Sequence, residues 1–140
     1  MLFRSKMADT MSYLKPGIGN ASSYQVAGKP FVTGNLSIPA SGSTPLQLSF
    51  PQVTKKIIIL NPSAQDIRLG FSAAGVNNSN YVIIHKKDGN VHGRLDLEVK
   101  CTSIFLLSAG SATSADVAAE LTSIDVREIP NNWSGSLGVG

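Results

Sequence analysis

Short stretches of apolar, or alternating apolar and polar, residues follow one another through the middle of the chain. Each stretch is closed by glycine, proline, asparagine or serine. They begin roughly 8 to 15 residues apart, with no long helical period between them, which is typical of an all-β sandwich or barrel. The pattern predicts about eight strands, over residues 31–38, 46–50, 55–61, 67–71, 81–85, 94–101, 103–108 and 116–124. Because no strand–helix–strand unit is visible, we do not expect a parallel sheet with a nucleotide crevice.

The clearest strands lie in the middle of this series. Residues 57–60 form a continuous apolar run closed by Asn61, so we expect a central strand that is covered on both faces. Residues 94–101 alternate strictly, which turns four side chains inward and the charges outward. The four inward side chains are Leu95, Leu97, Val99 and Cys101.

Turns and the last strand are also readable. Asp88 and Gly89 predict a tight turn within the loop 86–90. Residues 115–121 also suit a helical turn, but the β-like residues that follow favour a final strand. We expect the core to include Ile57, Ile59, Leu69, Leu97, Phe105 and Leu107.

The composition indicates a weakly charged surface. Charged residues make up 15% of the 140-residue chain, against a usual share of about 25%. Such a surface is easily desolvated and suits a protein surrounded by copies of itself, although an ordinary serine- and threonine-rich sandwich has the same composition. The net charge is +3, and the basic residues are scattered along the chain. They do not form a dense stripe with aromatic residues between them, so we expect no specific nucleic-acid partner.

Compartment signals are few. Cys101 is the single cysteine and cannot form an internal disulfide. No apolar stretch reaches the roughly 18 residues that span a bilayer, so we expect no transmembrane segment. The first residues lack the apolar region of a secretory signal.

Residues that carry chemistry do not form a recognisable active site. His85 and His92 flank one loop, whereas a cupin-type metal site needs several ligands that converge inside a barrel. Cys101 has no local nucleophile motif, and Asp96 with Glu98 shares the outward face of one strand. We therefore expect no enzyme, no catalytic residue, no metal and no cofactor.

The two ends of the chain differ from the middle. Residues 1–29 and 130–140 are rich in glycine, serine and asparagine, and they flank a predicted domain at 30–129. Large apolar side chains in these ends are candidates for contact with partners: Tyr13, Leu14, Tyr24, Trp133 and Leu137. The alternatives are a disordered N-terminal arm and a Trp133 that folds back onto its own domain.

A second kind of surface is visible before the strand at 81–85. Tyr81 follows Asn77, Asn78 and Asn80, a combination of aromatic and amide side chains that is typical of sugar platforms. These residues are candidate partner contacts. They also support the alternative function, a carbohydrate- or receptor-binding β-sandwich such as a fibre head or lectin-like module.

Several stretches resemble one known family. They are Phe-Ser-Ala-Ala-Gly-Val-Asn-Asn-Ser-Asn-Tyr at 71–81, Leu-Asp-Leu-Glu-Val-Lys at 95–100, Ser-Ile-Phe-Leu at 103–106, 119–124, and 23–31. Together they resemble the small single jelly-roll capsid proteins of large icosahedral double-stranded DNA viruses, in particular the penton proteins of algal viruses and iridoviruses. The resemblance covers most of the chain from Tyr24 to Ile124, and it contains no catalytic signature.

The resemblance implies an eight-stranded single jelly roll with extended terminal arms. It implies a structural capsid protein in which five copies close each five-fold vertex of the virion. The expected partners are the chain itself, as a homopentamer, the double jelly-roll major capsid protein, and other minor capsid proteins. The protein would be made in the host cytoplasm and would have no active site.

Overall fold

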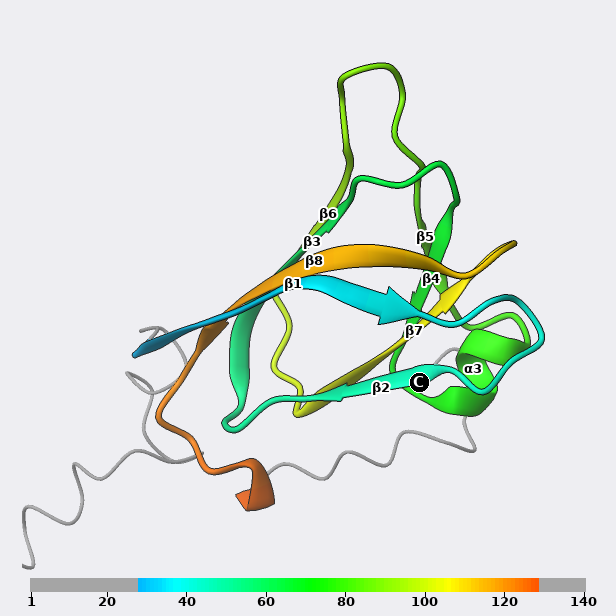
Figure 1. The fold of residues 1–140 in the computed structure, drawn as a ribbon. Helices are drawn as coiled ribbons and strands as arrows, with labels where there is room; N and C mark the ends of the chain where they lie inside the picture. Colours follow the sequence, from blue (N-terminus) through cyan, green and yellow to red (C-terminus); the bar gives the residue numbers. More distant parts are fainter. Residues whose placement is uncertain (1–27, 129–140) are drawn as a thin grey trace, which may run out of the picture.

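Two antiparallel sheets packed face to face form the body of the molecule (Figure 1). The computed structural model describes residues 28–128. One four-stranded sheet has the order β1-β8-β3-β6 and the other the order β2-β7-β4-β5. The strands are β1 (Lys29–Ile38), β2 (Leu46–Ser49), β3 (Thr54–Asn61), β4 (Ile67–Gly70), β5 (Val82–Ile84), β6 (Gly93–Leu97), β7 (Ser103–Ser108) and β8 (Thr113–Leu121). The prediction of an all-β protein with two sheets is confirmed.

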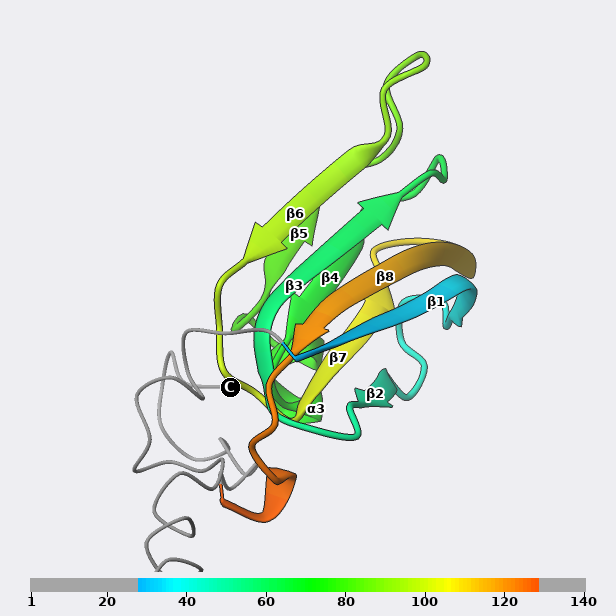
Figure 2. The same ribbon diagram turned by 90° about the vertical axis from the view of Figure 1, so that its left-hand side faces the viewer.

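The order of pairing follows a simple rule along the chain. The first strand pairs with the last, β2 with β7, β3 with β6, and β4 with β5. The chain is thus a long two-stranded ribbon that turns back on itself between β4 and β5. Two further pairings, β3 with β8 and β4 with β7, join neighbouring parts of the ribbon into sheets. Figure 2 shows β5 and β6 along one flank of the sandwich and β1 and β2 along the other.

The strand predicted over 94–101 ends early, at Leu97. Beyond this point Thr54 of β3 holds the segment through its side chain, while its backbone amide donates to the Cys101 carbonyl at 3.0 Å. The Thr54 hydroxyl donates to the Val99 carbonyl at 2.7 Å and accepts from the Cys101 amide at 3.1 Å. The segment therefore leaves the sheet and crosses to β7 in the opposite layer.

The final strand also differs from its prediction, because it spans Thr113–Leu121 and not 116–124. Threonine again ends the strand: the Thr122 hydroxyl donates to the Val53 carbonyl at 2.7 Å, and the Ile124 amide donates to that hydroxyl at 3.2 Å. The resulting turn buries Ile124 completely although it lies outside any strand. A helical turn at 115–121 does not form.

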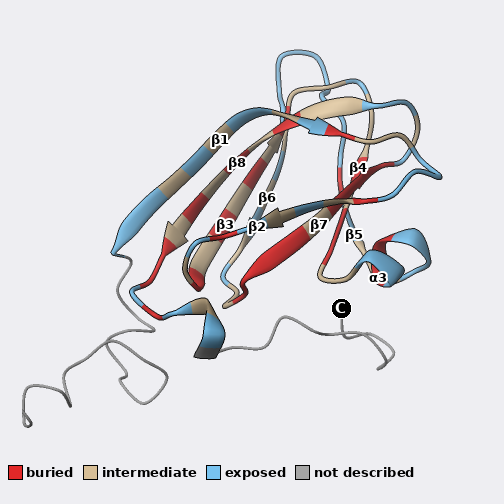
Figure 3. Cartoon of the chain, turned by 60° about the horizontal axis from the view of Figure 1, so that its bottom comes forward, coloured by how far each residue is buried: buried red, intermediate tan, exposed pale blue. Residues whose placement is uncertain are grey.

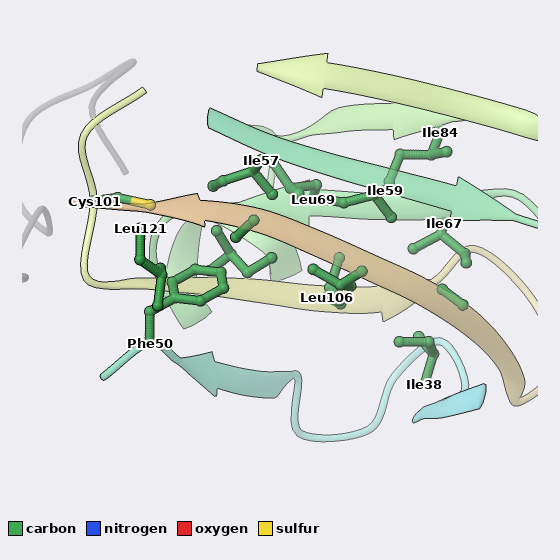
Figure 4. Packing of buried hydrophobic residues seen from close by; sticks show 14 residues of the cluster. Ile38, Phe50, Ile57, Ile59, Ile67, Leu69, Ile84, Cys101, Leu106 and Leu121 are labelled. Carbon is green, nitrogen blue, oxygen red and sulfur yellow. The ribbon is translucent and has the colours of Figure 1, made fainter. Parts of the chain in front are cut away.

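The core lies between the two sheets (Figure 3). Figure 4 shows its aliphatic side chains interleaved from both layers, with Phe50 at one end. Phe50 meets the ring of Phe31 edge-on at a centroid distance of 5.3 Å. β8 contributes the small residues Ala115 and Ala119 to this core. The fully buried members include Ile57, Ile59, Ile67, Leu69, Ile104, Leu106 and Val117.

Four of the six predicted core residues are buried, and two are not. Ile57, Ile59, Leu69 and Leu107 are at most 1% exposed. Leu97 is half-buried against the core, and Phe105 is half-buried because its neighbours Ile104 and Leu106 take the inward positions of β7. The expectation that 57–60 is covered on both faces is wrong, since Ile58 and Leu60 on the outer face of β3 are only half-buried.

Candidate partner-contact surfaces

The predicted contact residues fall into two groups. Tyr13, Leu14, Tyr24, Trp133 and Leu137 lie outside the residues that the structure describes. Asn77 is the last residue of a short helix, α3 (Ala73–Asn77), which lies between the strands predicted over 67–71 and 81–85; Asn78 caps its end, and Tyr81 follows three residues later.

Local hydrogen bonds explain why α3 forms. Ser72 caps its start, because the Ser72 hydroxyl accepts from the Gly75 amide at 3.0 Å. At its end, the Asn78 side-chain amide donates to the Ala74 carbonyl at 2.8 Å. Both Asn77 and Asn78 are exposed, and Asn78 in addition closes the helix through this hydrogen bond.

Tyr81 is held by an arginine that the sequence analysis did not single out. The guanidinium carbon of Arg68 lies 4.7 Å from the centroid of the Tyr81 ring, a cation–π geometry. Pairing of β4 with β5 creates this contact, because it places Arg68 directly opposite Ile83. The Nε of Arg68 is buried and has no hydrogen-bond partner.

A hollow of about 270 Å³ is lined by Tyr81 and by residues at the end of β4 and the start of β5. Asn80 and Ser79 contribute to its wall, but Asn77 and Asn78 do not. Only part of the predicted sugar platform of aromatic and amide side chains is thus brought together. One face of the Tyr81 ring is stacked on Arg68, so a single face is left for a ligand.

At the opposite end of the sandwich, a hairpin projects beyond the sheets (Figures 1 and 2). We call residues 85–92 the projecting hairpin. Asn61, which is fully buried, holds its base: the side-chain amide donates to the carbonyls of Ile84 and His85 at 3.2 and 3.1 Å, and to Gln65 at 2.7 Å. The Asn61 oxygen accepts from the amide and the hydroxyl of Ser63. One buried amide thus ties the β3–β4 turn to the end of β5.

The base of the projecting hairpin is closely packed. Gly93 lies against the carbonyl of His85 so closely that a Cβ at this position would collide with it. On the other strand of the hairpin, the Lys86 amide donates to the Asp66 carboxylate at 2.7 Å. These contacts fix the direction in which the hairpin leaves the domain.

The tip of the projecting hairpin is a tight turn, as the sequence predicted. Asp88 and Val91 exchange backbone hydrogen bonds of 2.8 and 2.9 Å. Between them Gly89 has a φ of 60°, which a type II′ turn requires of its first central residue. Every residue from 85 to 92 is exposed, and Val91 is 71% exposed. The hairpin therefore adds nothing to the core.

The residues that could carry chemistry are spread over the molecule. His85 and His92 lie on the exposed hairpin. Cys101 is buried at the other end of the core, far from Ile84, the neighbour of His85 (Figure 4), and burial raises the pKa of its thiol. Between residues 28 and 128, no three histidine, cysteine or acidic side chains form a group that could hold a metal ion.

The acidic residue of β6 is an ion-pair partner. Arg94 donates to both carboxylate oxygens of Asp96, at 2.8 and 3.0 Å, and Lys56 lies 3.9 Å away. The hydrogen bond from Arg94 lowers the pKa of Asp96. Glu98 is exposed beyond the end of the strand.

Within the described part of the chain, no helix is long and apolar enough to cross a membrane. Comparison of the sequence with protein-family models and with curated proteins gives no match.

Proposed function

We propose that this chain is a structural capsid protein, a single jelly roll that closes the five-fold vertices of an icosahedral virus as a homopentamer. The observation that carries the proposal is the pairing of strands along a doubled-back ribbon, β1 with β8 through to β4 with β5. A ribbon of this kind, rolled into two sheets, is the architecture of jelly rolls, which include viral capsid and lectin domains and the cupins.

The exposed histidines argue against the cupin among these three. A cupin site needs ligands that point into the barrel, whereas His85 and His92 are exposed on the projecting hairpin.

The geometry at Tyr81 weakens the alternative of a carbohydrate- or receptor-binding module. Stacking on Arg68 occupies one face of the ring, and Asn78 is used to close α3. The sequence resemblance to single jelly-roll penton proteins favours the capsid function.

A capsid function accounts for the ordered features that contribute nothing to the hydrophobic core. A vertex protein works through shape: rigid elements contact identical copies and neighbouring capsomers. The projecting hairpin, pinned by Asn61 and exposed along its length, is such an element. The ends of the chain, with Tyr13, Tyr24 and Trp133 among their apolar residues, are proposed to contact the major capsid protein and other minor capsid proteins.

The test is electron microscopy of purified particles that contain the chain, combined with mass spectrometry of their proteins. We expect density for five copies of this sandwich at each five-fold vertex. A chain that is absent from the particles, or that occurs in them away from the vertices, would contradict the proposal. A glycan screen of the purified protein tests the alternative.

A further inference from the structure

The described residues expose apolar side chains on two opposite flanks. Val82 and Ile83 of β5 are 47% and 40% exposed, and Val32 of β1 is 76% exposed. Since β5 ends one sheet and β1 ends the other, the two patches face away from each other (Figure 2). A contact between identical copies that joins two different patches is heterologous, the type that generates rings.

The patch on β1 borders a groove. Val32 and Ile58 lie on either side of Ala118 in one row across β1, β8 and β3. This row faces outward, because Val117 and Ala119, the neighbours of Ala118 in β8, are buried. Since alanine is much smaller than the residues beside it, the row encloses a hollow of about 340 Å³ on the outer face of the sheet.

An acidic side chain stands at the edge of this groove. Glu120 lines it, together with Pro30 and Lys29. Lys56 lies opposite Glu120 in the sheet, but its amino group is 3.9 Å from Asp96. Glu120 itself takes part in no ion pair with any residue between 28 and 128.

The patch on β5 carries the complementary charge. Arg68 is directly opposite Ile83, and none of the described acidic side chains pairs with it. Its Nε is buried and lacks an acceptor, and Tyr81 stacks on the guanidinium. Stacking restricts the arginine before a partner arrives, so less side-chain entropy is lost when a carboxylate binds.

We propose that a second copy of this chain inserts its β5 edge, with Val82 and Ile83, into the groove at Val32 and Ala118, and that its Arg68 pairs with Glu120 of the first copy. The inference deepens the proposed function, because it names the contact between neighbouring copies. It rests on the proposed function for the closure of the copies into a ring. Each copy offers the β5 edge on one flank and the groove on the other, so the same contact repeats from copy to copy. The exposed apolar side chains of both patches and the charges of Arg68 and Glu120 then all have partners in the same contact.

Charge exchange in the full chain tests this contact by sedimentation velocity over a range of protein concentrations. We expect the wild type to associate reversibly. Arg68→Glu and Glu120→Arg should each weaken association about tenfold or more, because each places like charges together in the contact. The double variant Arg68→Glu/Glu120→Arg should restore association to near the wild-type level. Arg68→Lys should weaken it less than Arg68→Glu, since the charge remains but the planar fork is lost.

Arg127→Glu and Glu98→Arg are the matched controls, because they reverse exposed charges outside both patches and outside the projecting hairpin, and they should leave association unchanged. Circular dichroism and thermal unfolding check that each variant is folded. A wild type that stays monomeric at every concentration, or a double variant as weak as the single ones, overturns the inference. If charge exchange restores association but virus particles do not contain the protein, the contact is confirmed and the vertex function is refuted.

Discussion

Asn61 offers the sharpest test of how the projecting hairpin is held. Replacing it with alanine removes an amide that is 0% exposed and that donates to the carbonyls of Gln65, Ile84 and His85. It also removes the oxygen that accepts two hydrogen bonds from Ser63. An amide has two donor hydrogens and accepts two bonds, so about four hydrogen bonds of about 1 kcal/mol each are lost.

Water can reach some of the released groups at the half-buried β3–β4 turn, which reduces the loss. We therefore expect Asn61→Ala to lower the free energy of unfolding by about 2 to 4 kcal/mol, a large part of the 5 to 15 kcal/mol typical of a domain. Chemical denaturation measures this change. Ser63→Ala is the control, and it should cost about 1 kcal/mol because it removes one hydroxyl from the same network.

Hydrogen exchange of the Lys86 amide gives a second measurement at the base of the hairpin. This amide donates to Asp66, and its protection depends on a hairpin that stays in place. Asn61→Ala should speed its exchange more than that of amides in β7. If the variant unfolds at the wild-type denaturant concentration and the Lys86 amide exchanges at its former rate, Asn61 does not hold the hairpin.

Three further predictions concern the core, acid stability and the buried thiol. Ile104→Ala should lower the free energy of unfolding by about 2 to 5 kcal/mol, and Phe105→Ala by less, because Ile104 is fully buried and Phe105 is not; chemical denaturation compares them. The hydrogen bond from Arg94 lowers the pKa of Asp96, so the ion pair stabilises the fold above the ordinary aspartate pKa of about 4. This contribution is lost as the pH falls through the lowered pKa. Asp96→Asn should therefore flatten that part of a curve of unfolding free energy against pH. Cys101 should react with a thiol reagent only as fast as the native protein opens, and rapid reaction at neutral pH would show that the thiol is accessible.

Much of the strand pattern was predictable from alternation and turn residues, whereas strand ends were not. The ends at Leu97 and Leu121 depend on the hydroxyls of Thr54 and Thr122, which bond to carbonyls 45 and 69 residues away in the chain. No local pattern encodes such contacts. The orientation of Phe105 was also hidden, because an unbroken apolar run does not say which of its residues face inward.

The contact surfaces were less predictable than the fold. Tyr81 was recognised as a candidate, but its stacking on Arg68 arises only when β4 pairs with β5. The groove at Ala118 arises from residues of β1, β8 and β3 that are adjacent only in the folded sheet. Composition and spacing show which residue types are present, whereas the pairing of strands determines which side chains are in contact.

The position of β8 between β1 and β3 also bears on the time at which the protein can fold during its synthesis. β1 is the first of the described strands to leave the ribosome, yet its partner in the sheet, β8, is the last of them to be made. At about 5 to 20 residues per second, β1 waits several seconds before that partner exists. A chain that stops short of β8 leaves both β1 and β3 without their shared neighbour. We therefore expect chains that stop before β8 to remain unfolded and to be removed by proteases.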